Sequence, residues 1–464
     1  MMNELTHIIE RVNIEVDVTD TSTASHIRDN LQQFLYGNVL PQLESMLNGV
    51  SGGDEYYRAK SLSLEFDFDS KAQFDERFSS ELLERLGKII TTMLPSKRED
   101  NVEEKKEQFE KKSTGEKQWQ IFIHFLANGT LPWFVSRDRE WLDEKKLLEF
   151  INTASINTAF INTAFINWKY SFYSLIRDHP LATKRLLRQF SADFIVQFIG
   201  AYIEQDITVF ERLYGGNISA TAASIELQRL QKVILFELLQ YLSRLDAPVA
   251  LSTTALKEIV ANLAVQERKA ENNDDQRSSP EEADAEKEDS TEEKKEGIYI
   301  SQAGLILLHP FLQYFFEELA LLENKQFKDI AARQTAVHLL HYLATGREQP
   351  MEHDLLMEKY LCGSYIHEPI ERFVVLTDSM KEECGQLLQA AIGHWTALKG
   401  TSADGLREGF LQRNGKLITG EKDNLVVESK SFDILLEKLP WSHSIISLPW
   451  LKKELYVDWQ TGMK

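Results

Sequence analysis

The densest group of side chains that could do chemistry lies in the last third of the chain. Its members are His338, His341, His353, Cys362 and His367. His338 and His341 are three residues apart, and on a helix this spacing places two imidazoles on one face, as in many pairs of metal ligands. Cys362 with a histidine base would be the corresponding nucleophilic site. The group therefore raises two hypotheses, a metal site and a cysteine nucleophile.

The local sequence favours a structural interpretation of these residues. His338 and His341 lie in AVHLLHYLA, which places them beside Leu339 and Tyr342 at a helix–helix contact. No HExxH or CxxC pattern accompanies them, and no Asn or Asp that would orient a base is evident near Cys362. We therefore predict structural histidines, no metal, no cofactor, no catalytic residue and no enzymatic activity.

The segment TSADGLREGFLQRNGKL holds a serine, an aspartate and an arginine close together. Thr401 or Ser402 is in the right place to cap a helix, and Gly415 is predicted to stop it. The functional alternative is anion binding at that helix start. No GxGxxG or Walker pattern, which would cradle a phosphate, occurs in the chain.

Two tryptophans follow prolines, in LPW at 439–441 and again at 448–450. Proline disfavours helix for the residue before it and keeps the chain extended. We predict that Trp441 and Trp450 pack into a core. The alternative is a docking surface for a protein partner, because tryptophan is enriched among interface anchors.

Charge and cysteine content limit the partners and the compartment. The formal net charge is −20, so the field of the whole molecule repels phosphate backbones and anionic lipids. Nucleic acid and membranes are therefore not expected as partners. The two cysteines, Cys362 and Cys384, form no CxxC pair, and no signal peptide or membrane-length apolar window is seen. A reducing cytoplasm is the expected location.

The first 96 residues are predicted to form a small βαβα unit. Residues 8–18 alternate as a strand, and residues 25–47 have helical spacing. Residues 62–68 alternate at period two, with Leu62, Leu64, Phe66 and Phe68 on one side, and helical spacing returns at 74–94. Residues 97–118 are highly charged and are interpreted as a linker or a solvated helix.

The middle of the chain, residues 119–265, has mainly helical spacing. A tandem pentad of INTAS, INTAF, INTAF and IN occupies residues 151–167. Its period fits neither a helix nor a strand, so we interpret it as an in-frame duplication tolerated within a helical region; a spacer and a β-solenoid coil are the alternatives. Residues 266–297 are acidic and of low complexity, and are predicted to be a linker, disordered or helical.

The C-terminal region, residues 298–464, is predicted to be an α-rich domain that closes with short strands. The expected helices are at 311–322, 328–344, 355–361, 381–399 and 402–413. A strand pair at 425–427 and 455–459 is expected around a short helix at 431–439. The fold class is therefore mainly α, with α+β ends.

Five segments of this region resemble the family of contractile injection system tape measure proteins. They are LLHPFL (307–312), AVHLLHYLATG (336–346), KYLCG (359–363), IGHWTALKGTSADGLREGFLQRNGKL (392–417) and LPWSHSIISLPWL (439–451). They keep a consistent order over most of about 160 residues. HIIERVNIEVDV near the N-terminus and LPWF at 131–134 add weaker support.

The resemblance implies a structural and assembly role in a bacterial, phage-tail-like contractile particle. Such a protein would act as a tape measure that sets the length of the inner tube, working in the cytoplasm during assembly and then inside the tube. The implied partners are the inner tube protein, the baseplate spike or hub and a tube cap protein, with self-association left open. The alternative is an adaptor or chaperone that docks the spike, cap or cargo to the tube or baseplate. The helical region of about 200 residues would span on the order of 300 Å and is interrupted at Gly129, Pro132, Pro180 and Pro248.

Overall fold

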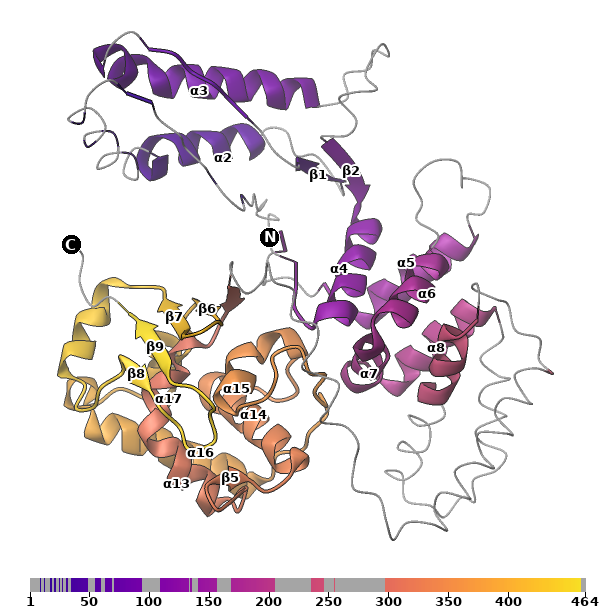
Figure 1. Ribbon diagram of the computed structural model, residues 1–464, viewed down its shortest axis with the longest axis vertical. Coiled ribbons are helices and arrows are strands. Elements are labelled where there is room, and N and C mark those ends of the chain that lie inside the picture. Colours follow the sequence, from indigo (N-terminus) through magenta and orange to yellow (C-terminus); the bar gives the residue numbers. More distant parts are fainter. Residues whose placement is uncertain are drawn as a thin grey trace. The chain divides into compact units, whose positions relative to one another are not determined.

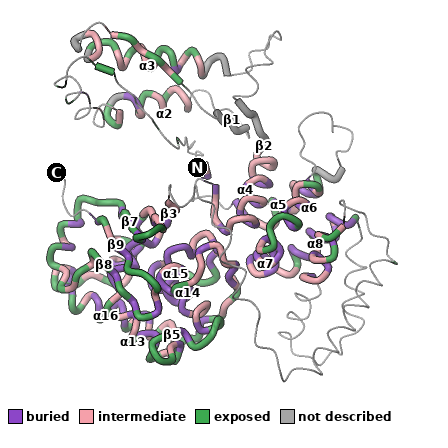
Figure 2. The backbone as a smooth tube through the Cα atoms, in the orientation of Figure 1, coloured by how far each residue is buried: buried purple, intermediate pink, exposed green. Residues whose placement is uncertain are grey.

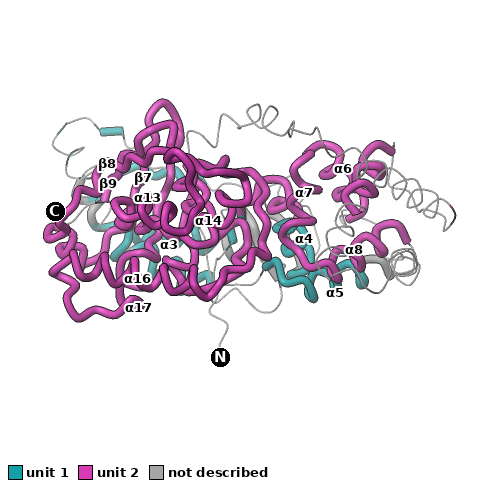
Figure 3. The backbone as a smooth tube through the Cα atoms, turned by 90° about the horizontal axis from the view of Figure 1, so that it is seen from below, with its two compact units in different colours: residues 1–122, 131–153 teal, residues 123–130, 154–464 magenta. Residues whose placement is uncertain are grey.

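The structure is a computed structural model that describes part of the chain. The described residues are isolated positions between 9 and 31, then 35–48, 55–59, 63–68, 71–93, 109–132, 134–135, 141–156, 168–204, 235–245, 254 and 297–459. Most of the predicted strand at 8–18 and the acidic segment at 266–296 lie outside them. Two compact units, 1–122 with 131–153 and 123–130 with 154–464, are coloured in Figure 3.

The fold is mainly α-helical, with short strands near both ends, as predicted (Figure 1). In the first unit, helix α2 (Leu40–Asn48) packs on the long helix α3 (Lys71–Met93). A close approach between Gly87 of α3 and the end of the Met46 side chain is part of this contact. Helix α3 confirms the helical spacing seen at 74–94.

The strand predicted at 62–68 is wrong. The described part, 63–68, has no secondary structure, yet its burial alternates as expected, with Leu64, Phe66 and Phe68 half-buried. Phe66 and Phe68 pack edge-on against Phe78 of α3. The alternation therefore reports which side chains face the helix, whereas a strand also needs a hydrogen-bonded neighbour, and the described residues provide none here.

The strand ladder of the first unit lies elsewhere. Strand β1 (Glu55–Ala59) pairs antiparallel with β2 (Phe109–Ser113), which falls inside the charged segment 97–118. Helix α4 (Thr114–Asn128) follows directly, and Trp119 on it stacks on Phe150 of α5 (Glu144–Ile156). Helix α5 carries the first pentad; residues 157–167 of the repeat lie outside the described residues.

In the second unit, three helices form an aromatic bundle. They are α6 (Trp168–Asp178), α7 (Pro180–Gln189) and α8 (Ala192–Ile203). Pro180 begins α7, where a missing N–H costs nothing, and the Ser191 side chain caps α8 by accepting from the Phe194 N–H. Phe172 and Phe198 pack edge-to-face at the centre. We call residues 123–130 and 168–203 the helical body.

Residues 298–459, the C-terminal body, contain a five-stranded mixed sheet. Its order is β3-β6-β7-β9-β8, and β7 pairs parallel with β9, as expected of a closing strand pair. The other neighbours are antiparallel. The strands are β3 (Ile298–Ile300), β6 (Gly415–Ile418), β7 (Asp423–Val427), β8 (Ile445–Ile446) and β9 (Leu455–Asp458).

Helices and two short strands complete the C-terminal body. The main helices are α13 (His309–Glu318), α14 (Ile330–Thr345), α15 (Leu356–Leu361), α16 (Asp378–His394) and α17 (Ala403–Leu406). Strands β4 (Leu322–Glu323) and β5 (Gln326–Phe327) form a hairpin. The short helix Ser431–Lys438 has 3₁₀ geometry, and a π-helical turn, Arg407–Leu411, continues α17. All the helices predicted in this region are present within a few residues.

The core of the C-terminal body is apolar and draws all its residues from 300–459 (Figure 2). Trp395, Trp450 and Trp459 are buried in it, and Trp441 is half-buried against it. Each indole N–H donates within this body, to the carbonyls of Leu435, Leu361 and Leu307 and to the carboxylate of Asp433. Trp441 and Trp450, the two tryptophans that follow prolines, therefore pack in or against the core, as predicted. None of the described helices is long and apolar enough to cross a bilayer.

Candidate functional site: a buried ionic junction

The structure places the predicted histidine and cysteine group at several separate contacts. His338 Nε2 lies 2.7 Å from the carbonyl oxygen of Glu371, and because a carbonyl only accepts, the ring carries its proton on Nε2. His341 Nδ1 lies 3.1 Å from Glu358 Oε1, in a buried pair where burial raises the pKa of the glutamate. His341 thus serves a helix–helix contact between α14 and α15, as the sequence favoured, whereas His338 joins α14 to the loop residue Glu371.

The other members contact different parts of the second unit. His367 Nδ1 donates to the Asn128 carbonyl at 2.9 Å, and the His353 ring packs edge-on against Phe125. Cys362 is buried, which raises the pKa of its thiol and opposes nucleophilic use. Among the described residues, no group of three or more His, Cys, Asp or Glu side chains is placed to hold a metal ion.

Ser402 confirms its predicted role as a helix cap, since its Oγ accepts from the Gly405 N–H at 3.0 Å. Gly415 does not stop that helix; it opens strand β6, where a Cβ would lie 2.8 Å from Ala303 Cβ and 2.9 Å from the Val426 carbonyl oxygen. A glycine is therefore needed there for close packing of β6, and the helix has already ended at Leu411.

His338 predicts a dependence of stability on pH. Burial lowers its pKa to about 4, so between about pH 6.5 and 4 the unfolded chain binds more protons than the folded one. The free energy of unfolding should fall as pH drops through this window, with a contribution of about 3 kcal/mol at its acid end. Urea unfolding across the window should show a smaller loss for His338→Gln, which keeps a donor for Glu371. An equal loss in both proteins would contradict the assignment.

The most distinctive polar feature of the described residues is a network of buried charges. Arg185 of α7, Glu352 of the 3₁₀ turn Glu352–Asp354 and Lys359 of α15 are each at most 1% exposed. Arg185 Nε donates to Glu352 Oε2 at 3.0 Å, and Lys359 Nζ donates to Glu352 Oε1 at 2.7 Å. One carboxylate thus sits between two cations that the chain brings together from positions 167 and 7 residues away.

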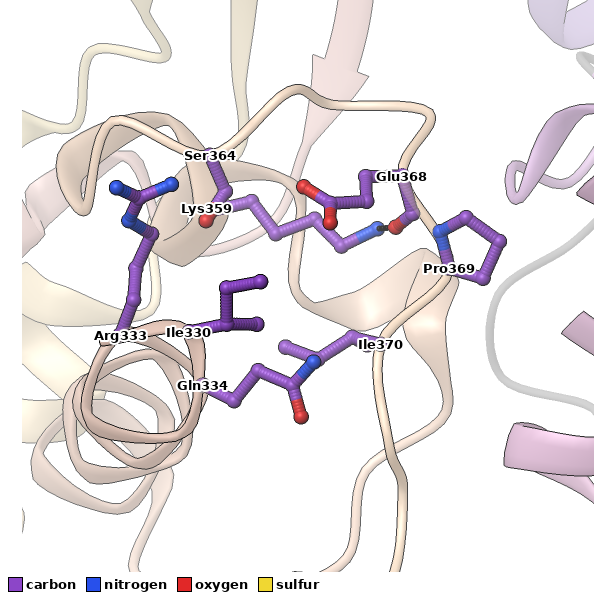
Figure 4. Close-up of a pocket in the computed structure, with 8 residues that line it drawn as sticks. All are labelled: Ile330, Arg333, Gln334, Lys359, Ser364, Glu368, Pro369 and Ile370. Atoms are coloured by element: carbon purple, nitrogen blue, oxygen red, sulfur yellow. Dashed lines mark hydrogen bonds between the residues drawn. The ribbon is translucent and has the colours of Figure 1, made fainter. Parts of the chain in front are cut away.

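Backbone carbonyls complete the shell of both cations. Arg185 donates through Nη1 to Leu126 and Ala127 and through Nη2 to His367. Lys359 also donates to Ile366 at 3.0 Å and to Glu368 at 2.6 Å. Figure 4 shows Lys359 reaching along a small recess to the backbone of Glu368. The one net positive charge of this network is therefore spread over carbonyl dipoles.

The network is the centre of a wider junction between the helical body and the C-terminal body. Gln189 Nε2 donates to the Ile370 carbonyl at 2.8 Å, and its Oε1 accepts from the Glu352 N–H at 2.7 Å. Arg188 donates to the Pro369 carbonyl at 2.6 Å. In the other direction, the Arg372 N–H donates to the Arg188 carbonyl at 3.0 Å. Because α7 presents residues 185, 188 and 189, all three donors come from one face of that helix.

The sequence had marked Gly129, a residue of this junction, as a break in the helical pattern. It has a φ of +76° and ends α4, with its N–H bonded to the Phe125 carbonyl. A Cβ here would lie 2.4 Å from Glu352 Oε1 and 3.0 Å from Arg185 Nε. Glycine thus permits both the left-handed backbone and the approach to the ion pair.

The junction is built for docking rather than for chemistry. The Glu352 carboxylate is paired with both Arg185 and Lys359. The recess beside Lys359 has a volume of about 20 Å³, far smaller than the roughly 300–1,000 Å³ of ligand pockets. Sequence reasoning missed it, because a helical Arg-x-x-Arg-Gln pattern looks like an ordinary solvated face. The local signals were Gly129, the histidines His353 and His367, and the position of Lys359 in the KYLCG segment.

The comparisons with known proteins give one match. The sequence model of the family described as contractile injection system tape measure protein matches residues 6–459. The match therefore covers nearly the whole chain, including both units and the junction. The searches of curated proteins and of solved structures returned no match.

Proposed function

We propose a role in tube assembly for this chain, which belongs to the contractile injection system tape measure protein family. Membership makes it a structural component of such a system, and the role of the family is not enzymatic. The finer proposal is that it sets the length of the inner tube. It would do so in the cytoplasm during assembly, and then lie inside the tube, in contact with the inner tube protein, the baseplate spike or hub and the tube cap.

The proposal on how length is set is supported by the packed core of the C-terminal body. A packed core of buried residues from Ile300 to Trp459 resists being drawn out into an extended form. This body would therefore act as a folded end that docks at the tube or baseplate. The spacing must then come from the residues before it, where the longest described helix, α3, has 23 residues and spans roughly 35 Å.

A series of insertions tests the ruler. One, two and three copies of a helical segment of about 21 residues, each adding roughly 30 Å when helical, would be placed within the pentad repeat at 157–167. The mean tube length, measured by electron microscopy, should rise in equal steps. The matched control puts the same segments into the exposed turn at 420–422 of the C-terminal body, where the length should stay constant. Unchanged length across the first series would remove the ruler proposal.

A second candidate is an adaptor or chaperone that docks the spike, cap or cargo. It is favoured by exposed apolar side chains on the sheet of the C-terminal body, where Tyr299 is 59% and Val426 42% exposed. Both flank Lys416 in one cross-strand row. Deletion of residues 266–296 should then lower cargo loading without changing tube length, whereas a ruler should shorten the tube.

A further inference from the structure

The two bodies on either side of the ionic junction have separate hydrophobic cores. The core cluster of the C-terminal body contains only residues from 300–459. The helical body has its own buried aromatic cluster, in which Phe172, Phe194 and Phe198 are at most 1% exposed. Ring contacts of Phe172 with Phe198 and of Phe194 with Phe198 hold this cluster together. Each body can therefore keep its core when the other is removed.

What joins the bodies is polar. Arg185, Arg188 and Gln189 donate from α7 to one carboxylate and three backbone carbonyls of residues 352–370. An aromatic contact across the junction is the edge-on approach of Phe125 to the His353 ring. The junction surface of the C-terminal body accepts from Arg185, Arg188 and Gln189, which lie at positions i, i+3 and i+4 of α7. It also donates, from the Glu352 and Arg372 N–H groups to Gln189 and Arg188.

We infer that this junction is a reversible latch, which opens to release the helical body while both bodies stay folded. On opening, water hydrates Arg185 and Glu352, and this hydration free energy offsets much of the cost of breaking the ion pair. Exposing an apolar interface of the same kind would bring no such gain, because water solvates apolar side chains poorly. Glu352 keeps Lys359 as its partner in the open form, because both belong to the C-terminal body. In the open form, the Glu352 carboxylate of the C-terminal body is therefore not buried without a counter-charge.

The latch rests on the proposed function for its purpose, since a length-setting chain must place its spacer away from its folded end. The closed form would be the one that α7 stabilises through its hydrogen bonds to residues 352–372. The chemistry of this surface also defines what could replace α7 there: a helix with arginine at two positions three apart, followed directly by a side chain amide that both donates and accepts, as Gln189 does. Residues 352–372 would then bind either α7 of the same chain or a helix of a partner protein.

Native-state hydrogen exchange on the purified full chain, read by mass spectrometry, tests the latch. Residues 352–372 report on it, because the amides of Glu352 and Arg372 bond across the junction to α7. In the wild type these amides should exchange at least about 10-fold faster than the buried amides of α14, through partial opening. Arg185→Leu should speed their exchange by a further factor of about 10² or more while α14 stays unchanged.

Two further variants make the outcome decisive. Gln189→Leu, a milder change, removes two junction hydrogen bonds and should speed exchange at 352–372 by about 10-fold. Arg177→Leu, the same substitution as Arg185→Leu at an exposed arginine of α6 paired with Asp178, should leave the exchange pattern unchanged. Equal acceleration of α14 and of 352–372 in the Arg185 and Gln189 variants would show a single cooperative unit and overturn the latch. Hydrogen exchange is measured on the purified protein without the particle. The latch and the tube-length proposal can therefore fail independently of each other.

Discussion

Glu352→Gln should lower the free energy of unfolding by about 3–5 kcal/mol, the usual cost of removing one partner from a buried ion pair. The substitution keeps the size of the side chain but removes the negative charge between Arg185 and Lys359. Two cations that are at most 1% exposed then face each other without a counter-charge. Since folded domains are stable by about 5–15 kcal/mol, this is a large share of the total.

Urea unfolding followed by circular dichroism measures the effect of Glu352→Gln. The matched control is Glu317→Gln on α13, whose carboxylate is exposed and accepts a hydrogen bond from Gln313. That surface change should stay within about 0.5 kcal/mol of the wild type. A loss of less than about 1 kcal/mol for Glu352→Gln would mean that the carboxylate is not the centre of the network.

The elements of the C-terminal body could be predicted because their signals are local. Apolar spacing located α14 and α16, and Ser402 was recognised as a cap from its place before an apolar run. The alternation in 425–427 and 455–459 identified β7 and β9. Each of these predictions depends on residues within one or two turns, so no knowledge of the distant chain was needed.

The sheet order and the junction could not be predicted, because their partners are distant. Strand β3 was missed: its three residues pair with β6 more than 110 residues later, and nothing in IYI marks that partner. The alternation at 62–68 correctly marked which side chains would be covered, but the covering element is helix α3. Likewise, the charge of Arg185 gives no sign that it is buried against Glu352, 167 residues away.

For the candidate site, the sequence did not mark the charged residues at the centre of the junction. It drew attention to His338 and Cys362, which are buried and engaged in packing contacts, and it did not single out Arg185 or Lys359 as buried charges. Lysine and arginine are seldom fully buried, so this was the expected interpretation. The absence of a metal or catalytic site stays a prediction, and the domain limits at 97, 119, 266 and 298 do too.

Gly304→Ala should be about as damaging as the loss of the Glu352 charge, and for a purely steric reason. The new Cβ would lie 1.7 Å from the carbonyl oxygen and 2.7 Å from the carbonyl carbon of Phe410. These are backbone atoms, so no side-chain rotation relieves the clash. The 3₁₀ helix Ala303–Leu308 and the turn Arg407–Leu411 must move apart, which also strains the hydrogen bond from the Ala303 N–H to the Arg413 carbonyl.

Overpacking of a core typically costs 1–3 kcal/mol, and for Gly304→Ala we expect about 3 kcal/mol or more because backbone must move. The same substitution at Gly385, inside α16, meets nothing within 4 Å. Alanine is the better helix former, so Gly385→Ala should raise the free energy of unfolding by about 0.4–1 kcal/mol. The same glycine-to-alanine substitution should thus lower the free energy of unfolding at Gly304 and raise it at Gly385. If urea unfolding places both variants within about 0.5 kcal/mol of the wild type, the close packing of Gly304 against Phe410 is wrong.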